Sequence, residues 1–264
     1  MHHLRVLSAL LLVLPFFLIV RFGSPFQFHL MLSAAILLCA WEFAWLCPLG
    51  ADRTMAAATA AGALALQWSM ISGTGSAAIP PALAVAMLVR ALGGREEFRT
   101  GVVQAAWTLL GAVYAGGLLG YGSLLRGSPA GREIVFFVAF TTWAGDIGAY
   151  YVGSRLGRRA LAPRISPKKT VEGALGGIAA TILAAALGSG AIWPSLPVVT
   201  AMWVGAVLAV VGMLGDLAES AVKRAAGVKD SGTIIPGHGG VLDRLDSVIF
   251  GCPVLYAFVW MGWV

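Results

Sequence analysis

Long apolar runs alternate with short polar stretches along the whole chain. The runs that predict membrane spans are residues 4–20, 26–46, 55–71, 77–92, 102–119, 134–151, 174–192, 198–217 and 248–264. A helix needs roughly 17 to 25 mostly apolar residues to cross a bilayer, and these runs are close to that length. The pattern therefore predicts an all-α, polytopic integral membrane protein with about nine transmembrane helices.

Composition agrees with a membrane protein. Of the 264 residues, 59% are hydrophobic and 11% are charged, whereas a soluble domain carries roughly 25% charged residues. Cys39, Cys47 and Cys252 lie in or beside apolar runs without paired spacing. We predict that they are small buried hydrophobes, so neither a disulfide nor a cysteine metal site is expected. No Ala-x-Ala-like cleavage site follows the first run, which is predicted to be a retained helix rather than a signal peptide.

The basic residues divide unevenly between the two faces that nine spans define. Of the 18 Lys and Arg residues, 15 fall on one face, and Arg21, Arg126 and Arg132 fall on the other. Cytoplasmic loops are enriched in Lys and Arg, so the richer face is assigned to the cytoplasmic side of the inner (cytoplasmic) membrane. This asymmetry accounts for the net charge of +6, and no nucleic-acid partner is expected.

The two halves of the chain differ in polarity. Residues 1–125 are predicted to be scaffold helices that face lipid or a second subunit, and residues 126–264 are predicted to be the catalytic transmembrane region. Glu42, beside Trp41 and Trp45 in the second run, is the exception in the first half. An intramembrane carboxylate is costly. Glu42 therefore either has a structural role, hydrogen-bonded to a neighbouring helix or reaching a membrane interface, or takes part in substrate passage.

Asp146 lies inside a predicted membrane span of the second half, residues 134–151. This residue shares one helical face with Tyr150 and Gly153, at spacings of 4 and 3. A carboxylate at this depth must face protein, water or a cation. Lys168 and Lys169 follow in a loop, just before the next helix begins. They are either basic anchors on the cytoplasmic side or ligands for a phosphate at that helix N-terminus.

A polar stripe ends the eighth run and leads into a polar, glycine-containing loop. The stripe residues recur at helical spacing and are Gly212, Asp216, Ser220 (or Glu219) and Lys223. Asp243 and Asp246 follow at i, i+3 where the last run begins. If the last two helices pack as antiparallel neighbours, Asp216 converges with these two carboxylates. The alternative is that all three are solvated charges at helix ends.

Carboxylates without cysteine favour a hard cation such as Mg²⁺ over zinc. The interleaved Lys and Arg residues favour a phosphate-bearing substrate held between metal and cations. Gly239 and Gly240 either let backbone amides approach an anion or form a turn, and His238 either contacts substrate or braces the loop. The residues alone predict a cytoplasm-facing, Mg²⁺-dependent phosphoryl or nucleotidyl transfer site that acts on a lipid.

Residues 220–246 read S-A-V-K-R-A-A-G-V-K-D-S-G-T-I-I-P-G-H-G-G-V-L-D-R-L-D. This stretch resembles the signature of the phosphatidate cytidylyltransferase family, also called CDP-diacylglycerol synthases. The polar, glycine, proline and apolar positions that fit it are Ser220, Lys223, Arg224, Lys229, Asp230, Gly232, Ile235, Pro236, His238, Gly239, Gly240, Asp243, Arg244 and Asp246. Residues 166–173, S-P-K-K-T-V-E-G, resemble a second motif of the family.

The resemblance implies the reaction CTP + phosphatidic acid → CDP-diacylglycerol + pyrophosphate, catalysed at the membrane by a homodimer. It implies a metal site of Asp216, Asp243 and Asp246 for Mg²⁺ with an accompanying K⁺. Ser220 and Lys223 would lie beside it, and with Asp243 and Asp246 they are the expected catalytic residues. The expected substrate contacts, chosen on chemical grounds, are Arg224, Lys229, Arg244, His238, Gly239, Gly240, Lys168, Lys169 and Asp146.

A different class of function is an ion-coupled membrane transporter, in which Asp146 and Asp216 would bind a cation. Such a transporter predicts inverted halves with matching broken helices, whereas the charge here is concentrated in one half. A CDP-alcohol phosphotransferase is a further alternative, but the motif D-G-x2-A-R-x8-G-x3-D-x3-D of that family is absent from the chain.

Overall fold

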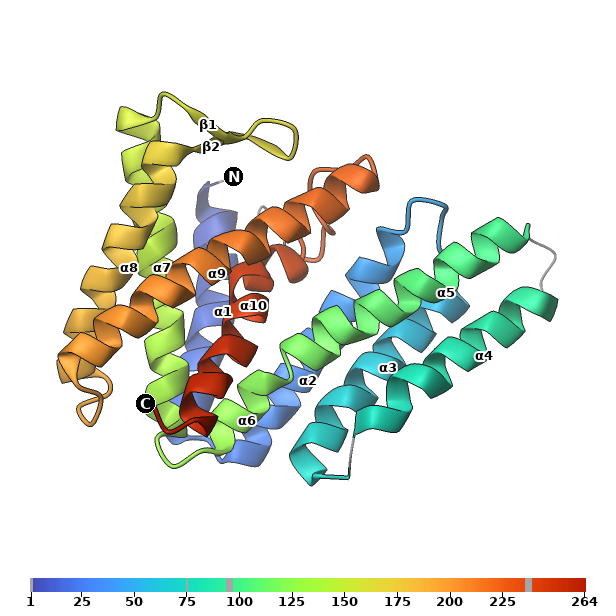
Figure 1. The fold of residues 1–264 in the computed structure, drawn as a ribbon, viewed down its shortest axis with the longest axis horizontal. Coiled ribbons are helices and arrows are strands. Elements are labelled where there is room, and N and C mark those ends of the chain that lie inside the picture. Colours follow the sequence, from blue (N-terminus) through green and yellow to red (C-terminus); the bar gives the residue numbers. More distant parts are fainter. Residues whose placement is uncertain (1, 75, 94–96, 236–238) are drawn as a thin grey trace. The chain divides into compact units, whose positions relative to one another are not determined.

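The part of the chain that the structure describes is mainly helical and contains one short hairpin. The computed structural model describes residues 2–74, 76–93, 97–235 and 239–264. The α-helices that it describes are α1 (His2–Phe22), α2 (Pro25–Trp45), α3 (Arg53–Ser72), α4 (Ile79–Gly93), α5 (Phe98–Ala112), α6 (Tyr121–Gly127), α7 (Gly131–Leu156), α8 (Val171–Ala191), α9 (Val198–Ala225) and α10 (Leu242–Trp260) (Figure 1). Every predicted span overlaps one of them, and the span at residues 102–119 continues from α5 into a π-helical segment, Val113–Leu118. The predicted all-α, polytopic class is confirmed.

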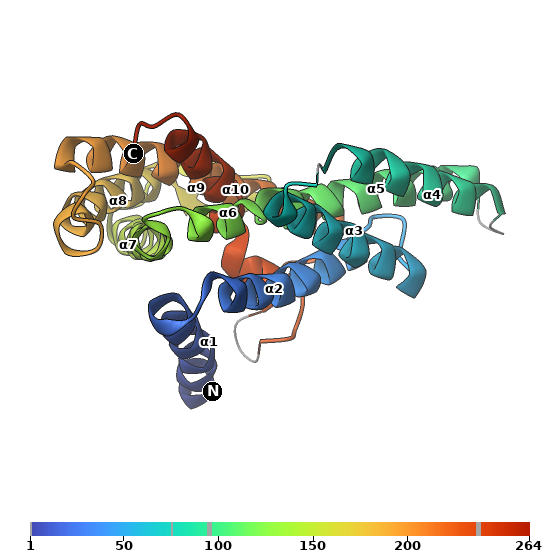
Figure 2. The ribbon, with the colours of Figure 1, turned by 90° about the horizontal axis from the view of Figure 1, so that it is seen from below.

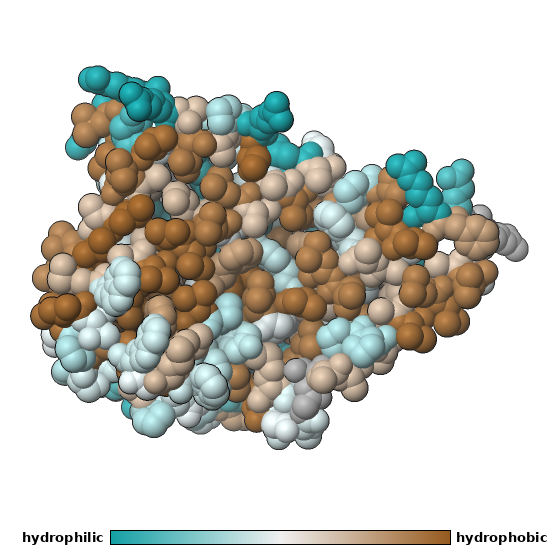
Figure 3. Space-filling model, viewed as in Figure 1, coloured by the Kyte–Doolittle hydropathy of each residue, from teal (hydrophilic) through white to brown (hydrophobic). Residues whose placement is uncertain are grey.

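Five of the described helical segments are long and apolar enough to cross a membrane. They are Pro25–Trp45, Phe98–Gly127, Gly131–Leu156, Val171–Ala191 and Val198–Ala225. Among the described residues, Leu12–Phe22 and Ile79–Gly93 form shorter apolar helices. Large apolar side chains such as Leu183, Leu187 and Trp203 are more than half exposed, and apolar residues cover much of the face in view (Figure 3). Such surfaces are unfavourable in water and suit contact with lipid.

The chain divides into two compact units. Unit 1 contains Met1–Leu124 and Val222–Leu245, and unit 2 contains Leu125–Ala221 and Asp246–Val264. The chain therefore returns to unit 1 for the last turn of α9, the loop that follows and the first turn of α10. Ser220 and Asp246, the two ends of the signature stretch, belong to unit 2, and the residues between Val222 and Leu245 belong to unit 1.

Unit 1 is built on helix pairs. Helix α3 packs against α2 and α5, and α4 packs against α5; α4 and α5 run side by side in both views (Figure 1, Figure 2). The Nε2 of Gln67 on α3 donates to Ser123 Oγ at 3.0 Å, and its Oε1 accepts from Ser33 Oγ on α2 at 2.8 Å. Asp52 caps α3 by accepting from Met55 N at 2.7 Å, which satisfies one of the backbone donors at the helix start. The contacts of Gln67 thus link α3 to α2 and α6.

Unit 2 centres on the close pair α7 and α8. Gly148 on α7 faces Ala180 on α8 so closely that a methyl group on Gly148 would collide with the Ala180 side chain. Small residues at such contacts let helix backbones approach in a membrane.

All three cysteines are free and buried, which confirms the prediction that they act as small hydrophobes.

The loop predicted between α7 and α8 contains a hairpin instead. Strands β1 (Ala160–Ala162) and β2 (Ser166–Thr170) pair antiparallel, with Ala160 opposite Thr170. The strands are short, and β2 carries proline and two lysines rather than alternating apolar residues, so no strand pattern is visible in the sequence. The predicted helix start is confirmed, because Thr170 Oγ1 accepts from Gly173 N at 3.1 Å as the N-cap of α8.

Candidate functional site

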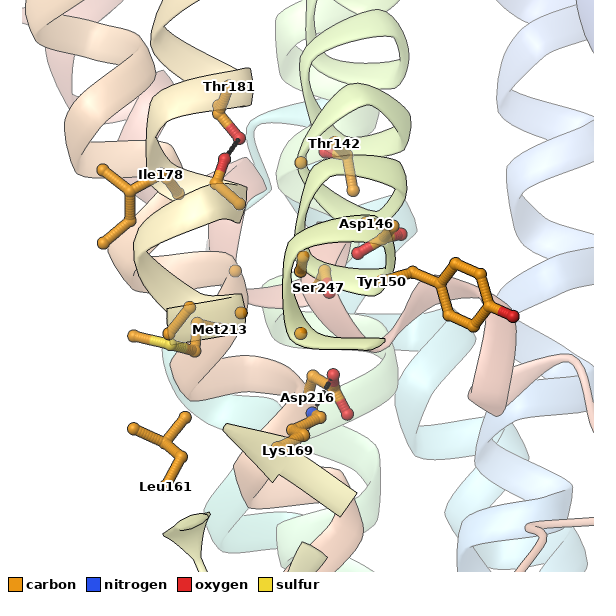
Figure 4. A pocket seen from close by; sticks show the side chains of 18 of the residues that line it. Thr142, Asp146, Tyr150, Leu161, Lys169, Ile178, Thr181, Met213, Asp216 and Ser247 are labelled. Carbon is orange, nitrogen blue, oxygen red and sulfur yellow. Dashed lines mark hydrogen bonds and ion pairs between the residues drawn. The ribbon is translucent and has the colours of Figure 1, made fainter. Parts of the chain in front are cut away.

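A cavity of about 520 Å³ lies in unit 2. Helices α7, α8, α9 and α10 and strand β2 all contribute to its lining. Its charged side chains include Asp146 from α7, Lys169 from β2 and Asp216 from α9 (Figure 4). Lys168 from β2 lines the cavity as well. Tyr150 lines it as well, so the predicted polar face of the sixth span does turn toward a cavity. The cavity therefore brings together both predicted lysines and two of the predicted acidic residues.

Lys169 and Asp216 form an ion pair in this cavity, and both side chains are 29% exposed. The hairpin explains the placement of the lysine, because β2 ends at Thr170 and leads directly into α8. Ser220 Oγ lies 3.5 Å from Asp216 Oδ1, one helical turn further along α9. The charge of this lysine is therefore directed at a carboxylate inside a cavity.

A group of three acidic residues lies at one place in unit 2. Among the described residues, Asp216, Glu219 and Asp246 each offer a carboxylate oxygen, and these oxygens lie within 4.8 Å of one another. Gly215 makes this approach feasible, because a Cβ there would lie 2.5 Å from the backbone oxygen of Asp246. Negative charges held this close repel one another unless a cation or proton offsets them. Oxygen donors of this kind suit a hard divalent cation.

Glu219 is the member of this group that the predicted metal set lacked. It is 1% exposed and follows Asp216 at i+3, one turn along α9. The helical stripe in the sequence already contained it as the alternative to Ser220. Glu219 can be assigned to the site only once Asp246 on α10 is known to lie beside it. The periodicity of α9 alone does not show this.

Asp243 has a different environment, in unit 1. Its Oδ1 accepts from Lys223 Nζ at 2.6 Å, and the two side chains are 7% and 11% exposed. Its Oδ2 accepts from Ser231 N at 2.9 Å, Ser231 Oγ at 3.0 Å and Gly240 N at 2.8 Å. Asp243 thus holds the loop between α9 and α10 against the start of α10. This loop carries much of the signature and is called the signature loop below. Its role as a metal ligand stays a prediction.

The signature also contains three exposed cations and a glycine with a positive φ. Arg224 Nη1 donates to Val228 O at 2.7 Å, and the side chains of Arg224, Lys229 and Arg244 are exposed. Gly239 has a φ of 82°, which only glycine adopts without strain, and its carbonyl accepts from Ile235 N at 3.0 Å. His238 lies outside the described residues.

Glu42 reaches the same loop from α2. It is 3% exposed and accepts hydrogen bonds from Val241 N at 3.0 Å, Leu242 N at 2.9 Å and Ser231 Oγ at 3.0 Å. Of its two predicted roles, the structure shows the hydrogen-bonded brace. The sequence shows that burying the Glu42 carboxylate in a membrane span is energetically costly. It does not show which residues donate to it, because they lie far along the chain.

Comparison with known proteins bears directly on this arrangement. A family model described as the cytidylyltransferase family matches residues 3–261. The chain belongs to the cytidylyltransferase family. The matched residues include both the lysine-lined cavity of unit 2 and the signature loop of unit 1. The predicted resemblance is confirmed at the level of the family.

Several relatives of this chain carry the name phosphatidate cytidylyltransferase. The protein from Synechocystis sp. is 48% identical over 132 residues, which is 50% of this chain and 44% of the relative. The Bacillus subtilis protein is 42% identical over 154 residues, 58% of this chain and 57% of the relative. The Brucella suis protein is 44% identical over 157 residues, 58% and 56% respectively. The matched part of the chain spans about half the length of these curated relatives.

Proposed function

We propose that the chain is a phosphatidate cytidylyltransferase, which transfers CMP from CTP to phosphatidic acid and yields CDP-diacylglycerol and pyrophosphate. The observation that carries the proposal is the family match over residues 3–261. The names of the relatives and the signature stretch support it. The cavity of unit 2 supports it chemically, since lysines and carboxylates together suit a phosphate-bearing substrate and its counter-ion.

In this reaction, an oxygen of the phosphate monoester attacks the α-phosphorus of CTP. The bond from that phosphorus to the oxygen bridging the β-phosphate breaks, and pyrophosphate leaves with the electron pair. The monoester is anionic at neutral pH, so the chain needs little general-base help. Its main task is to hold two polyanions together in the correct orientation. We assign this task to Lys168 and Lys169 in the cavity, with Asp146 orienting a polar group of the substrate.

Asp216 and Asp246, together with Glu219, fit a Mg²⁺ ion, because three oxygen donors lie within 4.8 Å of one another beside a cavity. A bound Mg²⁺ supplies positive charge where the triphosphate is most negative. Ser220 stands beside Asp216 and would support its orientation. The accompanying K⁺ and the ligand role of Asp243 are further parts of the proposal that come from the family resemblance.

The exposed cations of unit 1, Arg224, Lys229 and Arg244, are proposed to contact substrate phosphates, with Lys223 as a catalytic cation. Gly239, Gly240 and His238 complete the proposed substrate contacts. The basic asymmetry of the sequence supports an active site that faces the cytoplasm, in the inner membrane. A homodimer is proposed from the family resemblance, and crosslinking in native membranes tests it.

The test uses the full chain, purified in detergent and supplied with CTP and phosphatidic acid in mixed micelles. We expect equal amounts of pyrophosphate and CDP-diacylglycerol, abolition by a chelator, and recovery with Mg²⁺. Omission of phosphatidic acid controls for CTP hydrolysis. If neither product forms with Mg²⁺ present, the proposal fails, and cation flux in proteoliposomes would then favour the ion-coupled transporter.

A further inference from the structure

Glu42 and the signature loop form one hydrogen-bonded unit, although Glu42 lies outside the signature. Oε1 of Glu42 accepts from Val241 N, and Oε2 accepts from Leu242 N. Leu242 is the first residue of α10 and is fully buried. The first backbone N–H groups of a helix have no partner within the helix. Glu42 thus supplies, from α2, the acceptor and the negative charge that favour a helix start at this position.

Ser231 connects Glu42 to the Lys223–Asp243 pair. Its Oγ lies 3.0 Å from both Glu42 Oε2 and Asp243 Oδ2, and its backbone N donates to Asp243 Oδ2 at 2.9 Å. Because a hydroxyl has a single proton, Ser231 Oγ donates to either carboxylate in turn while its backbone stays fixed on Asp243. A continuous line of polar contacts therefore runs from α2 through Ser231 and Asp243 to Lys223 on α9.

Two signature glycines leave the space that this carboxylate occupies. A Cβ on Gly232 would lie 2.7 Å from Glu42 Oε1, and a Cβ on Gly240 would collide with Glu42 Oε2 and Ser231 Oγ. Both glycines have a φ outside the left-handed region, in contrast to Gly239. A side chain is therefore excluded at position 232 by the carboxylate of Glu42, and at position 240 by that carboxylate together with Ser231. Backbone conformation excludes it at neither position.

We infer that Glu42 is a positioning residue for the transfer reaction. It touches no substrate; it holds Ser231 and the start of α10 so that Lys223 and Asp243 keep their working orientation. The inference rests on the proposed function for its effect on turnover. Its effect on the loop is independent of that function, because the hydrogen bonds are present in the chain itself.

The test compares Glu42→Gln with Asp52→Asn in the full-length protein. The amide introduced by Glu42→Gln keeps one acceptor oxygen where two are needed. Asp52 also accepts a backbone N–H in unit 1 but caps α3 instead. For Glu42→Gln we expect kcat to fall about ten- to a hundredfold, the range for a lost hydrogen bond to a charged group. The KM values for CTP and phosphatidic acid should stay within about threefold. For Asp52→Asn we expect a wild-type kcat.

Hydrogen exchange supplies a readout that does not depend on activity. In Glu42→Gln, amides of residues 231–242 should exchange at least about tenfold faster while α3 and α5 keep their protection. Ser231→Ala should reproduce the local change, and the double variant should be no slower in turnover than Glu42→Gln alone. Ser231→Ala alone decides the matter if Glu42→Gln does not fold.

The positioning role is overturned by a wild-type kcat in Glu42→Gln, by unchanged exchange in residues 231–242, or by equal loss of protection throughout unit 1. These outcomes differ from failure of the proposed function. If the wild-type chain forms no CDP-diacylglycerol, the proposed function fails, while the exchange experiment still shows whether Glu42 holds the loop.

Discussion

Lys223 Nζ lies 2.6 Å from Asp243 Oδ1, and this pair of signature residues is enclosed, with side-chain exposures of 11% and 7%. The charge of Lys223 is matched by a carboxylate that also holds Ser231 and Gly240. Removal of one member leaves the other charge in a largely dehydrated place, which is more costly than removal of both.

The pair predicts a non-additive double variant. Lys223→Gln and Asp243→Asn should each lower the midpoint of thermal unfolding and the rate of transfer. Together they should cost less than the sum, with a coupling energy of about 1–3 kcal/mol. Unfolding in detergent, followed by circular dichroism, measures the first effect, and pyrophosphate release measures the second. Arg53→Gln, an exposed cation at the start of α3, should change neither. Additive effects would mean that the two residues act separately.

Asp246→Asn should abolish nearly all transfer while the protein stays folded. The substitution removes charge from the group that contains Asp216 and Glu219, which is the proposed metal site. Activity above roughly a tenth of wild type, a loss of less than ~1.4 kcal/mol in transition-state stabilisation, would remove Asp246 from that site. Glu97→Gln, an exposed carboxyl in unit 1, is the matched control and should be fully active.

Lys169→Gln should change metal binding and catalysis in opposite directions. Loss of the ammonium removes a positive charge beside Asp216, so Mn²⁺ should bind about three- to tenfold more tightly. Transfer should fall at least about fivefold, because a cation in the cavity is lost. Mn²⁺ titration by electron paramagnetic resonance and initial rates measure the two effects. Lys168→Gln is the control for a cavity lysine outside that ion pair. Weaker Mn²⁺ binding in Lys169→Gln would show that the lysine supports the geometry of the acidic group instead.

Gly232→Ala should destabilise the chain and slow transfer. The new methyl group would lie 2.7 Å from Glu42 Oε1, and a carboxylate held by three donors has little freedom to move. Overpacking of this kind costs about 1–3 kcal/mol. Gly190→Ala on α8, where a Cβ meets nothing within 4 Å, should be neutral or stabilising. Thermal unfolding of the two variants checks the contrast, and equal midpoints would show that the loop yields to the methyl group.

The helices were predictable because an apolar run of bilayer length has few alternatives to a helix. Helix ends were less so: α7 extends from Gly131 to Leu156, beyond both ends of the apolar run at residues 134–151. The hairpin of β1 and β2 was not predictable, since neither strand has an apolar pattern. Its effect is local but important, because it places Lys169 against Asp216.

The signature residues were predictable as a set, but their partners were not. Asp243 and Asp246 stand at i, i+3 and look equivalent in sequence. In the structure, Asp243 accepts hydrogen bonds from the loop of unit 1, whereas Asp246 joins Asp216 and Glu219 in unit 2. The brace from Glu42 depends on contacts between residues separated by most of the chain, which no local pattern encodes.

That brace has a consequence for biosynthesis. The donors to Glu42 lie 189 to 200 positions after it in the sequence. Synthesis proceeds from the N-terminus, so α2 reaches the bilayer before Ser231 or Leu242 exists. Until they emerge from the ribosome, the nascent helix carries a carboxylate whose burial without donors is costly. Helix α2 therefore gains the donors to its buried carboxylate only after Ser231, Val241 and Leu242 have been synthesised, and a chain interrupted before residue 231 would leave that carboxylate without them.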